Sequence, residues 1–534
     1  MSPDSDANWK PRHNPWAIAL TVTLATFMEV LDTSIANVAI PHIAGGLGAS
    51  QDEATWVLTS YLVSNAVILP ASAYLVSFLG RKRFYMICVA LFGLSSMLCG
   101  LAPSLPLLIL FRVMQGAGGG GLQPSEQAIL ADTFPPHKRG QAFAVYGMAV
   151  VLAPAIGPTL GGWITDNYTW RWIFFINVPI AILSLVLTSR IVEDPPHIRK
   201  EVALQRKRGL NLDYMGFGLL AVGFGSLQFV LDKGQENDWF GSHVITTFAV
   251  LCVGALATLI VWEIVQIRRG HRPILDLTMF RNRTFGVSTV LMFVLGFALF
   301  GTTVLIPLFV QQMMGYTAEQ AGLVISPGGL AILVLMPLVG FLVGRVDNRY
   351  LIVIGFATLS AALYALRTID TQASYSYVAW MRIFQASGLA FLFVPINTLS
   401  YTDVPREKNN DVSGLMNLAR NIGGSCGTSF FVTVLARRSQ EHQDRLAMYF
   451  NSASLQMRQA VAGLSNHLQQ SGITASPAQA RALAQGNLYQ QLIRQSTQLA
   501  YLDVIAILSI GTVCMIPLIF LMKKRKGGAP AGTH

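Results

Sequence analysis

Long apolar runs constrain the fold of this chain more than any other feature of its sequence. A helix needs about 20 consecutive, mostly apolar residues to cross a membrane, and we find fourteen such runs. Only 12% of the residues are charged, against roughly 25% in soluble domains. We therefore predict an all-α polytopic membrane protein with fourteen transmembrane helices. The predicted spans are 16–41, 54–79, 84–102, 106–132, 139–164, 171–190, 213–232, 243–266, 285–311, 318–344, 350–367, 376–402, 409–436 and 499–522.

The basic residues predict how these spans are oriented. Lys and Arg concentrate in the cytoplasmic loops of multi-pass membrane proteins. In this chain they concentrate in alternate short loops, and the short loops on the other side hold only Arg171, Lys233 and Arg367. An even number of spans then places both termini in the cytoplasm. The cytoplasmic segments would be the tails 1–15 and 523–534 and the linkers 191–212 and 267–284.

The chain also contains a weak internal repeat. The segment "FRVMQGAGG" at 111–119 resembles "MRIFQASGL" at 381–389, which pairs Arg112 with Arg382. Six spans therefore recur as six spans, and two further spans lie between the copies. In transporters built from two such halves, the substrate site lies between the halves near the bilayer midplane. We predict an N-terminal six-helix bundle at 16–190, two extra transmembrane helices at 213–266 and a C-terminal six-helix bundle at 285–522.

Two carboxylates interrupt the first span, in "FMEVLDTSIANV" at 27–38. Glu29 and Asp32 are three residues apart, so they share a helix face, which Asn37 continues. A charged side chain at the centre of a span costs roughly 2.5–3.5 kcal/mol on insertion scales. We therefore expect both acids to face a water-filled cavity and to exchange protons there. The alternative is a neutral, hydrogen-bonded carboxyl group that only joins helices.

The fourth span carries charges of both signs. Arg112 and Glu126 are fourteen residues apart, or about 21 Å along a helix, so they cannot pair directly. A buried guanidinium group needs an anionic or carbonyl partner, and Asp32 is a candidate. Glu126 could be a second proton carrier, a group that attracts cations, or a residue in water at the cytoplasmic mouth. Residues proposed to line a substrate cavity are Asn37, Gln115, Tyr146, Gln385 and Asn397.

Several classes of function are not expected from this sequence. The glycine run "GAGGGG" at 116–121 lies within a span and lacks the lysine of a phosphate-binding loop. We find no spacing typical of metal ligands, and we expect no metal, no cofactor and no enzymatic activity. The net charge of +11 follows from the loop pattern, so we expect the lipid bilayer and not nucleic acid as the partner of this surface.

Three segments resemble the major facilitator superfamily, and within it the fourteen-span drug:proton antiporters (EmrB/QacA-like), most of all the EmrB-like multidrug exporters of Gram-negative bacteria. They are "LATFMEVLDTSIANVAIP", "GPTLGGWITDNYTWRWIFFINVPI" and "SLQFVLDKGQENDWF". The resemblance implies proton-coupled efflux of hydrophobic drugs across a bacterial inner membrane, driven by the proton gradient. Alternatives are a dedicated exporter of one endogenous metabolite (a siderophore, fatty acid or antibiotic) and, from another class, a channel or receptor without coupled transport.

The resemblance also assigns roles to individual residues. It places the first-span acid of the family at Asp32 and implicates Arg112 in proton coupling. The segment "AVVLAPAIGPTLGG" at 149–162 resembles the antiporter motif. Small residues at this spacing allow close helix approach, and prolines permit a bend. The residues of this motif are Pro154, Gly157, Pro158, Gly161 and Gly162.

Two segments depart from the family pattern or extend it. The loop "AYLVSFLGRKR" at 73–83 has Ser77 where the superfamily usually has an aspartate, so we expect its basic residues only to fix orientation. Arg420, in span thirteen, is expected to serve packing. The long outer segment 437–498 is predicted to form a helical hairpin. In EmrB-like systems a periplasmic adaptor (membrane fusion protein) and an outer-membrane channel complete the exporter, and this loop is a candidate docking site.

Overall fold

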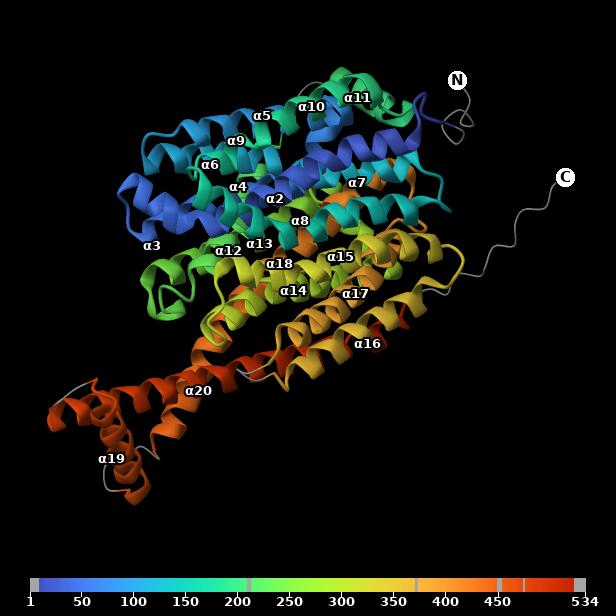
Figure 1. Cartoon of the computed structure of the whole chain (residues 1–534). Helices are drawn as coiled ribbons and strands as arrows, with labels where there is room; N and C mark the ends of the chain where they lie inside the picture. The colour runs from blue at the N-terminus through green and yellow to red at the C-terminus, as the bar shows by residue number, and fades with distance from the viewer. Residues whose placement is uncertain (1–8, 209–212, 370–372, 449–453, 474–475, 523–534) are drawn as a thin grey trace.

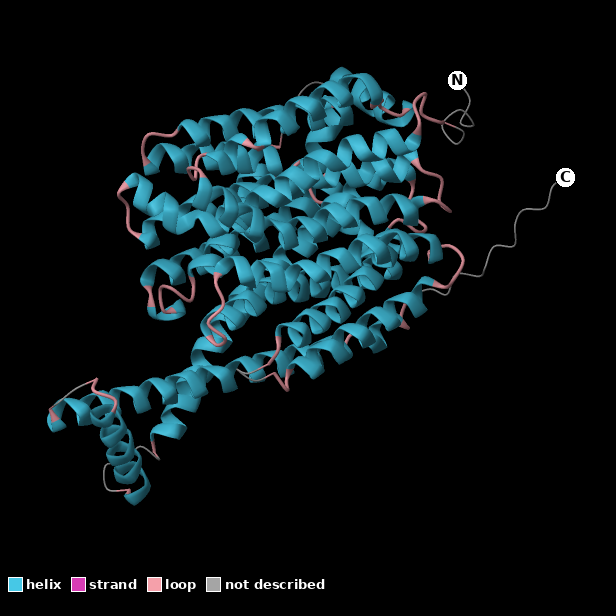
Figure 2. Ribbon diagram, in the orientation of Figure 1, coloured by secondary structure: helices cyan, strands magenta, loops and turns pink. Residues whose placement is uncertain are grey.

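A computed structural model describes residues 9–208, 213–369, 373–448, 454–473 and 476–522. Within these ranges the chain is helical, and the only strand-like feature is one isolated bridge between Val343 and Val346 (Figure 2). The predicted tail 523–534 and most of the tail 1–15 lie outside the described residues. The predicted spans all fall on helical segments whose ends differ from the prediction by a few residues.

The N-terminal half is one bundle of helices (Figure 1). The fourth predicted span is broken at Gly120 and Gly121, where α6 ends and α7 begins. The side chain of Asn14 caps the first helix of the half, and Ser50 and Glu53 form a capping box at α3. The helices are α2 (Pro15–Leu47), α3 (Gln51–Ala54), α4 (Trp56–Leu79), α5 (Arg81–Leu101), α6 (Leu105–Gly119), α7 (Leu122–Thr133), α8 (Arg139–Asn167), α9 (Trp172–Phe175) and α10 (Asn177–Ile191).

The segment between the halves contains more than a linker and two spans. The described part of the predicted linker 191–212 forms a helix that packs on α4. The two extra helices pack on each other, and the first of them also contacts both halves, through α4 and α18. These elements are α11 (Pro196–Arg208), α12 (Tyr214–Lys233), η1 (Trp239–Gly241), α13 (His243–Arg268) and η2 (Leu277–Arg281).

The C-terminal half repeats the arrangement of the first. The pair α14–α18 corresponds to α2–α8, and both pairs are among the most extensive helix contacts of the molecule. The halves meet where α8 packs on α15 and where α4 and α7 pack on α18. The elements are α14 (Arg283–Gln312), α15 (Ala318–Leu342), α16 (Asn348–Leu366), α17 (Tyr375–Ser400), η3 (Arg406–Lys408), α18 (Asn409–Ala447), α19 (Leu455–Gln470), α20 (Pro477–Val513) and α21 (Ile516–Ile519).

Thirteen of the helical segments in the described residues are long and apolar enough to cross a membrane. Helix α18, which carries the thirteenth predicted span, is too polar to be one of them. It nevertheless packs against α14 and α20 inside the bundle. Polar residues are tolerated in such a helix because neighbouring helices, and not lipid, surround them.

The predicted helical hairpin at 437–498 is present in α19 and the first part of α20, which pack on each other, and α20 continues into the last span. Helix α18 runs without a break through 39 residues and α20 through 37 residues, so each joins a span to the outer segment. Figure 1 shows their outer ends and α19 protruding from the bundle, at the end opposite α11. We call residues 437–498 the extension. The predicted start of its last helix is confirmed, with Ser476 as the N-cap and Pro477 at the first position.

Candidate functional site

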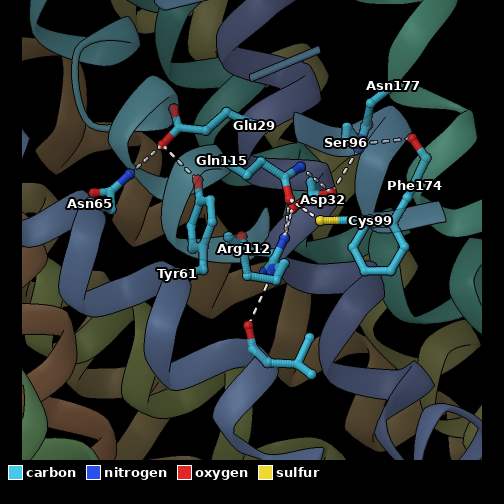
Figure 3. A network of polar contacts seen from close by, with 12 residues as sticks. Glu29, Asp32, Tyr61, Asn65, Ser96, Cys99, Arg112, Gln115, Phe174 and Asn177 are labelled. Atoms are coloured by element: carbon cyan, nitrogen blue, oxygen red, sulfur yellow. Dashed lines mark hydrogen bonds and ion pairs between the residues drawn. The ribbon is translucent and has the colours of Figure 1, made fainter. Parts of the chain in front are cut away.

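The buried carboxylate of Asp32 pairs with the guanidinium group of Arg112. The Arg112 Nη1 atom lies 2.6 Å from Asp32 Oδ2, and both side chains are at most 1% exposed. Arg112 also donates from Nε to the carbonyl oxygen of Val57 on α4, at 3.0 Å. The predicted partnership of these two residues is therefore present, and it connects α2, α6 and α4 (Figure 3).

Neutral side chains complete the surroundings of Asp32. Gln115 donates to Asp32 Oδ1 at 3.1 Å and accepts from Arg112 Nη1 at 2.7 Å. Asn177, the first residue of α10, donates to the same carboxylate oxygen at 2.7 Å. Sequence analysis did not single out Asn177. The only indication in the sequence was a single amide side chain at the start of an apolar span. Asn177 is far from Asp32 in the sequence and adjacent to it only in the folded structure.

A glycine run brings α4 close to this site. A Cβ atom at Gly116 would lie 2.4 Å from the Tyr61 carbonyl oxygen, and one at Gly120 would lie 2.7 Å from that of Asn65. Only glycine permits this approach, because any other residue would collide with backbone atoms. The run "GAGGGG" is thus a packing surface, and it holds the side chains of Tyr61 and Asn65 beside α2.

Tyr61 contacts both Glu29 and the arginine that pairs with Asp32 (Figure 3). The Arg112 Cζ atom is 4.4 Å from the centre of the Tyr61 ring, within the range of a cation–π contact. The Tyr61 hydroxyl donates to Glu29 Oε1 at 3.4 Å. Asn65 and Gln123 donate to the Glu29 carboxylate at 3.2 and 2.9 Å. Glu29 therefore meets only neutral donors, whereas Asp32 meets a cation.

Glu29 lines a cavity of about 180 Å³ between the halves, and Asp32 does not. The lining combines polar and apolar side chains from α2, α4, α7, α12, α14 and α18. The expectation that both acids face a cavity is therefore right for Glu29 and wrong for Asp32, which its partners enclose. The polar lining residues are Glu29, Thr33, Tyr61, Asn65, Gln123, Gln228, Asp232, Asn421, Ser425 and Thr428.

The five residues predicted to line a substrate cavity lie elsewhere. Gln115 belongs to the Asp32 cluster, and Asn37 is exposed near the outer part of α2. Tyr146, Gln385 and Asn397 are buried in hydrogen-bond networks. None of the five lines the cavity described above, because the relative placement of the two halves decides which polar residues reach it.

Arg420 of α18 connects the two halves. Its Nη1 atom donates to the Tyr146 hydroxyl at 2.7 Å, and its Nη2 atom donates to Gln123. Tyr146 in turn donates to Asn417 at 3.0 Å. Sequence analysis expected Arg420 to serve packing. Packing is not its main role, because its guanidinium group crosses to α7 and α8. Further along, Gln127 donates to Asn397 at 3.0 Å.

Glu126 is fully buried, so the alternative of a residue in water at a mouth is wrong. Its Oε1 atom accepts from the Thr23 hydroxyl at 2.6 Å. Its Oε2 atom has no hydrogen-bond partner among the described residues. A carboxyl group with one unpaired, enclosed oxygen can hold a proton, which keeps the alternative of a second proton carrier open.

The second half lacks the acid of the first. Arg382 is buried and donates to Gln385 at 2.7 Å, as Arg112 does to Gln115. The repeat that aligns Pro41 with Pro307 places Ala298 at the position of Asp32. The charge pair is thus confined to the N-terminal half, although the helix pattern is duplicated.

The profile of the Major Facilitator Superfamily matches residues 22–428 of the chain. The chain belongs to this superfamily. It is 39% identical over 435 residues to the multidrug export protein EmrB of Haemophilus influenzae, with 81% of this chain and 83% of that protein covered. It is 37% identical over 510 residues to the fatty acid resistance protein FarB of Neisseria gonorrhoeae, with 95% and 96% covered.

The fold agrees with solved structures of the superfamily. A proton:xylose symporter has a TM-score of 0.57 at 17% identity, with 80% of this chain and 90% of that chain covered. This likeness concerns the fold alone. The family and fold are those of a multi-pass membrane transporter, and not of an enzyme, which confirms the predicted class of the protein.

The superfamily loop after the second span builds a contact that sequence analysis did not expect. Arg81, buried at the start of α5, pairs with Asp132 at 2.5 Å and donates to Asn410 of α18 at 3.0 Å. Asn409 donates to the other oxygen of Asp132 at 2.6 Å. The expectation that this basic cluster only fixes orientation is therefore wrong for Arg81. The acid of the contact comes from α7 and not from the loop. We call these four residues the latch.

The segment that resembles the antiporter motif packs α8 against α2. A Cβ atom at Gly157 would lie 2.3 Å from Ser34 Oγ, and one at Gly161 would lie 3.1 Å from the Ile35 side chain. A Cβ atom at Gly162 would meet nothing within 4 Å in the described part of the chain. The motif thus sets the distance between α8 and the acid-bearing helix, with Pro154 and Pro158 inside α8.

Proposed function

We propose that this chain is a proton-coupled multidrug efflux transporter, which exports hydrophobic compounds across a bacterial inner membrane against an inward flow of protons. The observation that carries the proposal is the enclosed Asp32–Arg112 pair, which Tyr61 connects to a cavity between the halves. The names of the relatives, which include multidrug export and fatty acid resistance proteins, support the same conclusion.

The coupling step begins with protonation of Asp32 and reaches the substrate cavity indirectly. A proton on the carboxylate removes its charge, so the ion pair with Arg112 is lost. Arg112 also holds the Val57 carbonyl of α4, and α4 carries Tyr61 and Asn65 into the cavity. Protonation at Asp32 would therefore alter the cavity through α4. A proton and a substrate that favour different arrangements of the same helix are exchanged in alternate steps.

Alternating access requires contacts between the halves that can open at one end at a time. The latch closes the end that carries α11, and the Arg420–Tyr146 contact lies between α8 and α18. Polar contacts suit this role because water can replace them when the halves separate. The proton gradient supplies the free energy, and the mechanism uses no cofactor. We place both termini in the cytoplasm, in line with the distribution of basic residues.

We further propose that the extension binds a periplasmic adaptor, which in turn meets an outer-membrane channel. The extension presents apolar side chains to solvent, including Met448, Leu455 and Tyr489. Exposed apolar residues on protruding helices favour contact with other helices.

Purified protein in liposomes with an imposed pH gradient tests the transport proposal. Ethidium should accumulate only while the gradient lasts, and a protonophore should stop the accumulation. An ethidium flux that is unchanged after the gradient collapses would contradict proton coupling and would favour a channel.

A dedicated exporter is the second candidate, since the fatty acid resistance protein matches nearly the full length of this chain. A panel of unrelated dyes and fatty acids distinguishes the two candidates. A multidrug exporter moves several of these compounds, whereas a dedicated exporter moves one chemical class.

A further inference from the structure

Helix α12, one of the two helices inserted between the repeats, forms part of the wall of the cavity. Gln228, Leu231 and Asp232 line it together with Glu29 and Tyr61. All three α12 residues lie in the segment "SLQFVLDKGQENDWF", to which the proposed mechanism assigns no role. We propose that α12 contacts the transported substrate and that Asp232 selects for a cationic group on it. This inference rests on the proposed function, because it assigns a selectivity element to the same cavity.

The position of α12 is fixed from both halves. Asp232 Oδ2 accepts from Thr59 of α4, and Phe229 stacks on Trp56 with ring centres 5.7 Å apart. On the other side, Gln228 Oε1 accepts from Ser425 of α18 at 2.8 Å. Helix α12 therefore lies across the space between α4 and α18, and it closes the cavity there.

The lining favours an amphipathic cation. Neither Glu29 nor Asp232 forms an ion pair among the described residues, although Lys233 lies next in sequence. The Lys233 ammonium group instead contacts Thr55 and Glu236, neither of which lines the cavity. Arg420 is the cation nearest to Glu29, and its guanidinium group is held by Gln123 and Tyr146. Two carboxylates that have no direct ionic partner among the described residues thus border one small space, which attracts a positively charged group.

The remaining lining completes this recognition. The ring of Phe300 borders the cavity and can contact a cation, and Leu62 and Leu231 offer apolar surface. A flat or branched apolar body with one quaternary or protonated nitrogen matches both features. A hydrophobic anion matches only the apolar one.

Equilibrium binding to the full-length protein in lipid nanodiscs tests the inference without any proton gradient. The probes are ethidium, a monocation, and oleate, a monoanion. Asp232→Asn should weaken ethidium binding about tenfold, which corresponds to about 1.4 kcal/mol, and leave oleate binding within about twofold. Glu236→Gln, which neutralises a nearby acid outside the cavity, should change neither.

A second pair of variants tests the wall itself. Leu231→Trp should weaken the binding of both probes, because it fills the cavity from α12. Val222→Trp places the same ring on the exposed side of the same helix and should weaken neither. Retained oleate binding by Asp232→Asn also shows that this variant is folded.

Three results would overturn the inference: ethidium binding by Asp232→Asn within twofold of the wild type, equal losses for both probes in that variant, or unchanged binding by Leu231→Trp. Failure of the proposed function looks different. In that case ethidium would still bind in a manner that depends on Asp232, but a pH gradient would not drive its transport.

Discussion

About one helical turn separates Glu29 from Asp32, yet the two carboxylates have different partners. Asp32 faces a guanidinium group at 2.6 Å, in a site closed by Gln115 and Asn177. Glu29 faces amide and hydroxyl donors and borders the cavity. A proton that binds Asp32 must displace its ion pair with Arg112, whereas a substrate in the cavity can reach Glu29 directly.

The first prediction concerns the charge pair. Asp32→Asn should lower gradient-driven ethidium efflux at least tenfold, because an amide cannot take up the proton. Removing one partner of a buried pair costs about 3–5 kcal/mol, so the amount of folded protein in the membrane must be measured as well. Asp166→Asn is the matched control, since the side chain of Asp166 is 69% exposed. Wild-type efflux by Asp32→Asn would refute the proposed coupling.

The second prediction separates the ring of Tyr61 from its hydroxyl group. Tyr61→Phe keeps the ring contact with Arg112 and should change efflux less than about threefold. Tyr61→Leu removes a desolvated cation–π contact worth about 2 kcal/mol and should lower efflux at least tenfold. Initial rates in liposomes measure both. Equal rates for the two variants would mean that the ring does not connect the two acids.

Sequence analysis foresaw part of this site and missed the rest for a physical reason. An unpaired buried charge is energetically unfavourable, so the pairing of Asp32 with Arg112 could be predicted from the sequence. Tyr61 and Gln123 could not, because their roles depend on how closely α4 and α7 approach α2. The approach of α4 to α6 is set by Gly116 and Gly120, whose neighbours in space are invisible in the sequence.

At the scale of helices, the contact of α8 with α2 depends on small residues at defined positions. Gly157 lies against Ser34 and Gly161 against Ile35, whereas Gly162 faces open space in the described structure. The resemblance to an antiporter motif singled out all three glycines alike. The structure shows that only the first two hold the acid-bearing helix close.

The third prediction follows from this difference. Gly157→Ala should destabilise the purified protein by about 1–3 kcal/mol, the usual cost of overpacking, because its Cβ atom would collide with Ser34. Gly162→Ala should leave stability unchanged within error. Thermal unfolding in detergent measures both. A melting temperature of Gly157→Ala equal to that of the wild type would show that α8 shifts freely against α2.

The fourth prediction concerns the extension as an element. Replacing 445–490 by a short Gly/Ser linker should preserve ethidium transport in vesicles, because the cavity lies in the bundle. The same variant should lose drug resistance in whole cells, where the adaptor is needed. Membrane levels of the variant serve as the control. Equal losses in both assays would place the extension within the transport mechanism itself.

At the scale of the molecule, the apolar runs predicted the number of helices and the repeat predicted their grouping, but neither predicted how the halves touch. The apolar runs predicted the spans, because the thickness of the bilayer determines the length of a helix that crosses it. Span thirteen was predicted as one of the apolar runs, and it is helical, although α18 is not among the helices apolar enough to cross a membrane alone. The cavity lining was predicted wrongly, because it depends on the placement of two halves and of α12 between them. The latch could not be predicted for the same reason. Its acid, Asp132, belongs to α7 and not to the loop in which the superfamily usually has an aspartate.

The fifth prediction tests how the latch holds the halves. Arg81→Gln should raise hydrogen exchange at the ends of α7 and α18 that carry Asp132 and Asn409, because the buried pair that joins them is lost. Arg83→Gln removes an exposed charge two residues away and should leave exchange unchanged. Equal exchange in the two variants would show that other contacts close this end.

Arg420 at the contact between the halves and Ala447 in the extension belong to one uninterrupted helix, α18. From Arg420 to Ala447 that helix spans about 40 Å, and a rod of this kind transmits displacement with little loss. A protein bound at this end of α18 would therefore act on the contact between the halves, far from its own binding site. Binding of the proposed adaptor to this end of the extension would thus be coupled, through a single helix, to the contact between Arg420 and Tyr146.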